Sequence, residues 1–262
     1  TPIQDIIYNL SDTPIALSVE GLPLGLFYTF TGTQLVISGF PTEDISSPQS
    51  FTYTVETISQ DCESSVTGEI TVIPDDEILL TSAVGSDNQI VCENIEIDEI
   101  VYELQGGSLG ATVTGLPTGV SYNLDDTTGV LLLTISGIPI IDLGINNYTI
   151  STFGLCIPVE ISGTIEVLPA ISIIHDPVSG PTSQVLCQNT EIEPEIIFSI
   201  ENASNVNVTG LPDGCNYSVV VDPVTGTTTL SIFGSPTQLG IFNYLIETSG
   251  LLCESEFSGT LE

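Results

Sequence analysis

The chain has 262 residues, 41% of them hydrophobic, and a mean hydropathy of +0.38. This is enough apolar material for two or three folded domains, and it excludes a disordered chain. With 34 acidic residues, one histidine and no lysine or arginine, the chain carries a formal charge of −34 at pH 7. Nucleic acid and anionic membrane surfaces are excluded as partners, since binding to either needs cationic side chains. Without cationic side chains to pair with, each carboxylate is expected to be solvated or bound to a cation.

Internal repeats divide the chain into three units. The tripeptide Gly-Leu-Pro occurs at residues 21–23, 115–117 and 210–212, a spacing of 94 and 95 residues. The other markers that keep this spacing are Tyr53, Tyr148 and Tyr244, then Cys62, Cys156 and Cys253, then Gly68, Gly163 and Gly259. We predict three domains, namely residues 1–74 (repeat 1, N-terminally truncated), residues 75–169 (repeat 2) and residues 170–262 (repeat 3, C-terminally truncated). Because both chain ends fall within a repeat, we expect the chain to be a segment of a longer array.

Each unit shows the two-residue period of half-buried β-strands. Apolar residues alternate with polar ones over residues 120–125, 161–167 and 206–210. Residues 125–129 and 222–226 combine Asp, Thr and Gly as hairpin turns do. About seven short strands in roughly 95 residues, without a sustained helical period, are typical of an immunoglobulin-like sandwich. We therefore predict an all-β protein made of tandem immunoglobulin-like β-sandwich repeats in an extended array.

Six cysteines, with no Cys-x-x-Cys pair and no histidine nearby, indicate disulfides and not zinc. Disulfides place the chain in an oxidising, extracellular compartment. Repeats 2 and 3 carry cysteine at the same two places, so we predict the bonds Cys92–Cys156 and Cys187–Cys253, each within one repeat. The two cysteines expected to stay unpaired in this segment are Cys62, whose partner would lie upstream, and Cys215, a buried thiol at an apolar position of the repeat.

The motifs resemble those of a known class of surface protein. Residues 91–94 (Val-Cys-Glu-Asn), 115–120 (Gly-Leu-Pro-Thr-Gly-Val), 135–139 (Ile-Ser-Gly-Ile-Pro) and 154–156 (Gly-Leu-Cys) resemble repeats of giant SprB-like gliding-motility adhesins, which the type IX secretion system exports. They are also similar to the wider cadherin-like repeats of bacterial surface proteins. The resemblance covers the whole chain and implies an exported, filamentous molecule at the cell surface. It does not identify a binding site.

Few groups could carry chemistry. The Gly-Leu-Pro-x-Gly stretch has no lysine and no following helix, so it predicts a turn and not a phosphate-binding loop. His175 follows the junction of repeats 2 and 3, and we expect it to be an incidental residue of that junction. Asp125 and Asp126 lie on a predicted hairpin tip without a tryptophan platform for sugars, which favours a solvated turn over a glycosidase pair. We expect no catalytic or cofactor-binding residue and no enzymatic activity.

Calcium is the one cofactor for which the sequence contains candidate ligands. Asp75, Asp76 and Glu77 follow one another at the junction of repeats 1 and 2, and Ca²⁺ takes carboxylate ligands. The matching junction after Pro169 has no acidic cluster, and the sequence has no Asp-x-Asp-x-Asp-Gly loop. We therefore expect no cofactor, with ordered calcium at the first junction as the alternative.

The leading hypothesis is a structural and adhesive repeat region of a long bacterial cell-surface adhesin or filament, related to gliding motility or attachment. The alternative is a dedicated glycan- or protein-binding module of a surface protein. The expected partners are neighbouring repeats of the same polypeptide, surface glycans or proteins, and laterally associated chains, with neither nucleic acid nor membrane insertion. The expected location is extracellular, at the cell surface.

Overall fold

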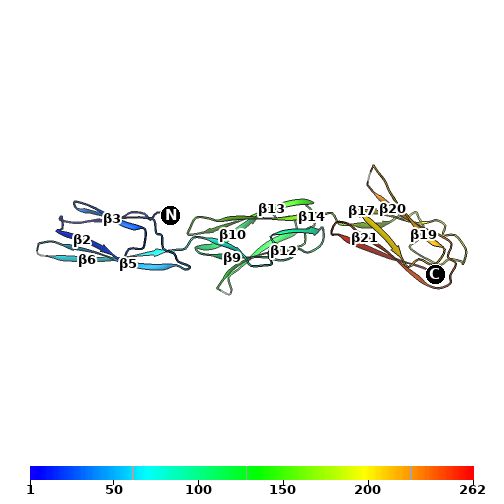
Figure 1. The fold of residues 1–262 in the computed structure, drawn as a ribbon, viewed down its shortest axis with the longest axis horizontal. Coiled ribbons are helices and arrows are strands. Elements are labelled where there is room, and N and C mark those ends of the chain that lie inside the picture. Colours follow the sequence, from blue (N-terminus) through cyan, green and yellow to red (C-terminus); the bar gives the residue numbers. More distant parts are fainter. Residues whose placement is uncertain (61, 128, 225) are drawn as a thin grey trace.

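The computed structural model describes residues 1–60, 62–127, 129–224 and 226–262. All regular secondary structure among these residues is β-strand. The strands form six sheets, two in each repeat. Three sandwiches follow one another along the long axis of the molecule, with the N-terminus near the middle sandwich and the C-terminus at the far end of the third (Figure 1). The predicted all-β fold in an extended array is confirmed. The described residues contain no helix of the length and hydropathy that a membrane span requires.

Repeat 1 consists of two three-stranded sheets that enclose a small apolar core. One sheet has the order β1-β4-β3 and comprises Ile6–Asn9, Gln34–Gly39 and Leu26–Thr31. The other has the order β2-β5-β6 and comprises Ala16–Glu20, Gln49–Ile58 and Glu63–Val72.

Repeat 2 has two four-stranded sheets, and its buried core is larger. The first sheet, β10-β13-β14-β8, comprises Ser108–Thr114, Gly144–Gly154, Glu160–Leu168 and Asn88–Cys92. The second sheet, β11-β12-β9-β7, comprises Val120–Asp125, Leu131–Gly137, Ile100–Gln105 and Glu77–Leu80. Pairing is antiparallel except between β14 and β8, which run parallel and bring Leu168 opposite Cys92.

Repeat 3 repeats this plan. One sheet, β16-β22-β21-β18, comprises Ser183–Gln184, Glu254–Leu261, Phe242–Ser249 and Asn205–Thr209. The other, β15-β17-β20-β19, comprises Ser172–His175, Ile196–Glu201, Thr228–Gly234 and Cys215–Val221. The strands predicted from alternating residues 120–125, 161–167 and 206–210 correspond to β11, β14 and β18. Within the two predicted hairpin turns, Thr128 and Thr225 lie outside the described residues.

The recurring Gly-Leu-Pro-x-Gly stretch is a turn, as predicted. In repeat 2 the carbonyl of Pro117 accepts a hydrogen bond of 3.0 Å from the amide of Val120. Gly119, at the third position of this turn, has a φ of 95°, which side chains rarely permit. The leading Gly115 has a φ of 83°, and a Cβ there would collide with the carbonyl of Asn147 on β13. The motif therefore recurs because the chain must turn tightly against a neighbouring strand.

Candidate functional site

The most distinctive feature lies where repeat 2 meets repeat 3. We call residues 168–171 joint 2–3, and residues 73–76, their counterpart between repeats 1 and 2, joint 1–2. Cys92 ends β8 in repeat 2, and Cys253 lies in the β21–β22 hairpin of repeat 3. The two form a disulfide with a Cα–Cα distance of 5.8 Å, and Cys253 is 6% exposed. A covalent bond therefore crosses joint 2–3 in addition to the main chain.

This pairing corrects the disulfides expected from the sequence. The bonds Cys92–Cys156 and Cys187–Cys253 are not formed, and Cys156 and Cys187 are free thiols, as are the exposed Cys62 and the buried Cys215. Cys156 precedes β14, whereas Cys92 pairs with the end of β14. Nine residues of strand span roughly 30 Å at about 3.3 Å per residue, far beyond the reach of a disulfide. The cysteines of one repeat thus lie at opposite ends of its sandwich.

Joint 1–2 has the same layout but no disulfide. The Cys156 thiol lies 3.3 Å from the carbonyl oxygen of Pro74 and 3.9 Å from that of Ile73, to which it can donate. Burial raises the pKa of the Cys156 thiol, and the carboxylates of Asp76 and Asp75 raise it further. Cys156 is therefore a protonated, half-buried thiol packed against the linker at neutral pH.

A buried carboxylate also lies at joint 1–2. Asp76 is only 6% exposed, and neither of its side-chain oxygens has a hydrogen-bond partner among the described residues. Of the two states expected for each carboxylate, solvation does not apply to Asp76. The described residues contain no group of three or more His, Cys, Asp or Glu side chains that could hold a metal ion. An uncompensated buried carboxylate costs free energy, because it has lost its water without gaining hydrogen bonds.

A groove flanks each of the two joints. The groove at joint 2–3 has a volume of about 520 Å³ and includes Ile95, Ile171, Leu252 and Cys253. The groove at joint 1–2 has a volume of about 410 Å³ and includes Thr1, Ile73, Leu155 and Cys156. In the repeat register Leu155 and Cys156 correspond to Leu252 and Cys253. An equivalent cysteine therefore lines the groove at each joint, and Thr1 lines the same groove as the unpaired cysteine of joint 1–2.

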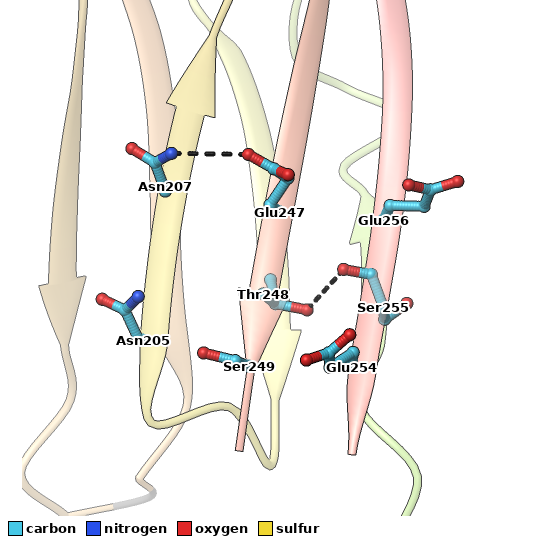
Figure 2. Close-up of a pocket in the computed structure, with 8 residues that line it drawn as sticks. All are labelled: Asn205, Asn207, Glu247, Thr248, Ser249, Glu254, Ser255 and Glu256. Carbon is cyan, nitrogen blue, oxygen red and sulfur yellow. Dashed lines mark hydrogen bonds between the residues drawn. The ribbon is translucent and has the colours of Figure 1, made fainter. Parts of the chain in front are cut away.

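A polar hollow of about 440 Å³ lies on one sheet face of repeat 3. Figure 2 shows Asn205 and Asn207 on β18 beside Glu247 on β21, with Glu254 and Glu256 on the next strand. The amide of Asn207 donates to Glu247 at 3.5 Å, and the Thr248 hydroxyl donates to the carbonyl of Ser255 at 2.8 Å (Figure 2). The hollow offers acceptor oxygens and amides without a cationic group, which suits a hydroxyl-rich or amide-rich surface.

Repeat 1 has an equivalent hollow of about 320 Å³, formed by Glu56, Thr57 and Ile58 on β5 and Glu63, Ser64 and Ser65 on β6. Its two glutamates occupy the places of Glu247 and Glu254 in the repeat register. Repeat 2 has Ser151 at the first of these places. The polar hollow is thus a feature of individual repeats, whereas the layout of the joints recurs.

The groups considered for catalysis have structural roles. His175 lies on β15 within repeat 3, and its Nε2 is 2.8 Å from the carbonyl oxygen of Gly180 and 3.2 Å from the Ser179 hydroxyl. The Ser179 hydroxyl donates to the carbonyl of Asp176 at 2.7 Å. His175 therefore braces a turn of its own repeat, and its expected place in the joint was wrong. On the β11–β12 hairpin the Asp125 carboxylate accepts the amide of Thr127 at 2.8 Å, which lowers the pKa of Asp125.

Comparisons with known proteins agree with this architecture. No protein-family model and no curated protein matches the chain. Among solved structures, a titin fragment of domains I67–I69 aligns with a TM-score of 0.59 at 11% identity, over 98% of this chain and 92% of that chain. An E-to-A variant of the same domains aligns with a TM-score of 0.60 at 12% identity, over 98% of this chain and 91% of that chain. The chain is a tandem array of immunoglobulin-like β-sandwiches.

The disulfide of this immunoglobulin-like array follows from where its cysteines lie relative to one strand, which the repeat period alone does not show. Cys156 comes before the predicted strand at residues 161–167, and in the structure the segment that ends at Cys92 pairs with that strand. A cysteine at each end of one strand excludes a bond between them. The partner of Cys92 then comes from the adjacent repeat, and Cys156 is a free thiol.

Proposed function

We propose that this chain is a structural and weakly adhesive repeat segment of a long extracellular surface protein, which extends a fibre and resists its unfolding. The observation that supports this proposal most directly is the Cys92–Cys253 bond across joint 2–3 of an end-to-end array. Immunoglobulin-like repeats that contact mainly their neighbours can be added in number without changing the core of any one repeat.

The disulfide changes which residues can be stretched. When the two chain ends are pulled apart, the load passes directly from Cys92 to Cys253, which are 161 residues apart in sequence. The intervening residues include most of repeats 2 and 3, and the bond shields them from extension. Such a bypass suits a molecule that is pulled outside the cell.

The finer assignment is a bacterial cell-surface adhesin or filament that serves gliding motility or attachment and is exported by the type IX secretion system. Its support is the resemblance of the repeat motifs, together with a disulfide that requires an oxidising compartment. The high acidic charge and the absence of lysine and arginine suit an exposed fibre, because proteases of the trypsin type find no cleavage site.

Adhesion would reside on the polar sheet faces. The hollows at Glu247 in repeat 3 and Glu56 in repeat 1 offer weak contacts that gain strength when several such repeats engage together. The alternative, a dedicated binding module, requires one repeat to bind a glycan or protein strongly on its own. Glycans, proteins and laterally associated chains are the partners proposed for these faces.

Force spectroscopy tests the structural role. We expect the oxidised chain, pulled from its two ends, to reach a final length shorter than the reduced chain by roughly 550 Å, since 161 residues at about 3.3–3.6 Å each are withheld. Cys92→Ser should abolish the difference, and Cys187→Ser, which removes a free thiol, should preserve it. Equal lengths with and without reductant would refute the load bypass, and a single tight ligand bound by one isolated repeat would favour the binding module.

A further inference from the structure

The groove at joint 2–3 is built by both repeats and contains the disulfide in its lining. Repeat 2 contributes β8, an edge strand of its sheet, and the segment that continues from β8 to Asp98. The joint contributes Ala170 and Ile171, and repeat 3 contributes the end of the β21–β22 hairpin with Cys253. Because Cys92 and Cys253 are bonded to each other, the two sides of the groove are covalently tied together.

Aliphatic side chains line this groove with much of their surface open to solvent. Ile90, Ile95 and Leu252 are 53%, 57% and 61% exposed, whereas Ile171 and Cys253 in the same lining are 8% and 6% exposed. Exposed aliphatic groups gathered in a concave site typically mark a binding surface, because a partner that covers them releases the water around them. The apolar part of the groove thus suits aliphatic side chains of a partner.

Hydrogen bonds hold residues 93–98, the wall of the groove that follows β8. The Gln89 side chain binds Asp98 twice, since its Nε2 donates to the Asp98 carbonyl at 2.7 Å and its Oε1 accepts the Asp98 amide at 2.9 Å. At the other end of the wall, the Glu93 amide donates to the carbonyl of Leu168 at 2.8 Å. Both ends of the wall are therefore fixed before a partner arrives, and a preformed site avoids the entropy cost of ordering a loop on binding.

The lining also holds four carboxylates, those of Glu93, Glu96, Asp98 and Glu254. The sequence contains no lysine or arginine, and its one histidine, His175, lies outside this lining. Compensating cations must therefore come from another molecule. A second copy of the chain carries the same formal charge of −34 at pH 7 and is repelled from the groove, so the charge of the site favours a cationic partner.

We propose that this groove binds a short segment of another protein in which lysine or arginine side chains accompany aliphatic ones. The aliphatic side chains of the segment cover Ile90, Ile95 and Leu252, and its cations pair with the carboxylates of the lining. The volume of about 520 Å³ lies within the roughly 300–1,000 Å³ of typical binding pockets, which suits a few side chains and not a whole domain. Such a docking site at the joint goes beyond the fibre role and the polar sheet faces proposed above.

A titration with synthetic peptides tests this match of chemistry. The probe is a short, capped peptide of alternating lysine and leucine, added to the oxidised full chain at about 0.15 M salt, where charges more than about 8 Å apart are screened. We expect it to bind at least about tenfold more tightly than a peptide of alternating lysine and serine, because only leucine buries apolar surface in the groove. A peptide of alternating glutamate and leucine should not bind. Fluorescence anisotropy of the labelled peptides gives the dissociation constants.

Two substitutions on one hairpin locate the apolar contact. Leu252→Ser should weaken binding of the lysine–leucine peptide at least about fivefold, because an aliphatic side chain is lost from the groove. Leu251→Ser is the matched control and should leave binding unchanged, since Leu251 lies on the same hairpin and is 88% exposed but does not line the groove. Thermal unfolding verifies that both variants are folded.

Two triple variants locate the cationic contact. Glu93→Gln, Glu96→Gln and Asp98→Asn together should weaken binding of the lysine–leucine peptide at least about fivefold, because three carboxylates of the lining are neutralised. The control removes the same charges from repeat 1, which lies beyond repeat 2 from this groove (Figure 1), and should have a much smaller effect because salt screens charges at that distance. Its substitutions are Asp5→Asn, Glu20→Gln and Glu69→Gln.

Several results would overturn the proposal. One is equal affinity for the lysine–serine and lysine–leucine peptides, which would leave only a general attraction of cations to an acidic chain. Others are a Leu252→Ser variant that binds like the parent, or an equal loss of affinity in the two triple variants. A second copy as the occupant would appear in sedimentation velocity as a dimer that Leu252→Ser dissociates, and this result too would overturn the proposal.

Discussion

At joint 1–2 the carboxylate of Asp76 takes the place that the buried side chain of Ile171 fills at joint 2–3. The neighbouring positions also differ, with Asp75 and Glu77 at one joint and Ala170 and Ser172 at the other. One joint thus combines an unpartnered carboxylate with a free thiol, whereas the other combines an apolar side chain with a disulfide. The two joints form a natural comparison within one chain.

Replacing the buried carboxylate should stabilise the protein. We expect Asp76→Ile, which copies the other joint, to raise the free energy of unfolding by about 1–3 kcal/mol, because an unsatisfied buried polar group is removed. Asp75→Ala, at the adjacent position, is the matched control and should have a smaller effect. Denaturant unfolding in the presence of a chelator measures the change. If added calcium makes the parent chain more stable than Asp76→Ile, Asp76 is a metal ligand and the ordered-calcium alternative is correct.

The buried tyrosines predict how stability responds to alkali. The Tyr8 and Tyr53 hydroxyls are hydrogen-bonded at 2.8 Å, and the Tyr244 hydroxyl donates to the carbonyl of Thr182 at 2.9 Å. Burial raises the pKa of Tyr53 to about 12, with a further contribution from Tyr8, and burial raises the pKa of Tyr244 to about 12. The unfolded chain loses these protons near the ordinary value of 10.0, so the folded state holds protons more tightly.

Stability should therefore be fully present below about pH 10 and fall as the pH rises towards about 12. Thermal unfolding followed across this range, together with the ultraviolet absorbance of tyrosinate, measures the effect. Tyr53→Phe should flatten the alkaline part of the curve, whereas Tyr122→Phe, at a position 38% exposed, should leave it unchanged. An alkaline unfolding curve for Tyr53→Phe that is identical to that of the parent would contradict the argument.

At the scale of elements, one cross-strand pair recurs in all three sandwiches. Tyr53, Tyr148 and Tyr244 lie directly opposite Gly68, Gly163 and Gly259 on the next strand. A Cβ on any of these glycines would collide with the tyrosine ring. The glycine marker therefore recurs because the ring lies flat across the neighbouring strand, a packing in which glycine alone leaves room.

Filling the space beside the tyrosine ring should destabilise the folded protein. We expect Gly163→Ala to lower the free energy of unfolding by about 2–3 kcal/mol, because the added methyl forces Tyr148 out of its place in the core. Ser162→Ala changes an exposed neighbour on the same strand and should stay within about 0.5 kcal/mol of the parent. Denaturant unfolding of both variants measures the difference. A neutral Gly163→Ala would show that the Tyr148 ring does not need this space.

Much of the fold could be predicted because its signals are local. Alternation over residues 120–125 identifies a half-buried strand, and Gly-Leu-Pro-x-Gly identifies a turn, without knowledge of distant contacts. The Cys92–Cys253 bond could not be read from the repeat period. The cysteines recur at the same spacing whether they pair within one repeat or across a joint. The burial of Asp76 was hidden for a similar reason. An acidic run at a junction looks solvated until the neighbouring repeat is placed against it.

At the scale of the whole molecule, shape depends on how freely the joints bend. Joint 2–3 is crossed by the main chain and by a disulfide, which together leave little freedom to rotate. Joint 1–2 is crossed by the main chain alone, with Cys156 hydrogen-bonded to the linker. Repulsion among 34 acidic residues without counter-charges opposes bending at both joints, and salt weakens it as the Debye length falls from about 30 Å at 0.01 M to about 3 Å at 1 M.

We therefore expect the oxidised chain to contract modestly when salt is raised from about 0.01 M to about 1 M, with bending confined to joint 1–2. Reductant, or Cys253→Ser, should free joint 2–3 and enlarge the contraction, because only then can repeat 3 also swing. Small-angle X-ray scattering gives the radius of gyration under all four conditions, and Cys187→Ser provides the control for loss of a thiol outside the bond. A compact particle at low salt would contradict the electrostatic argument. An identical contraction before and after reduction would show that the disulfide does not stiffen the joint.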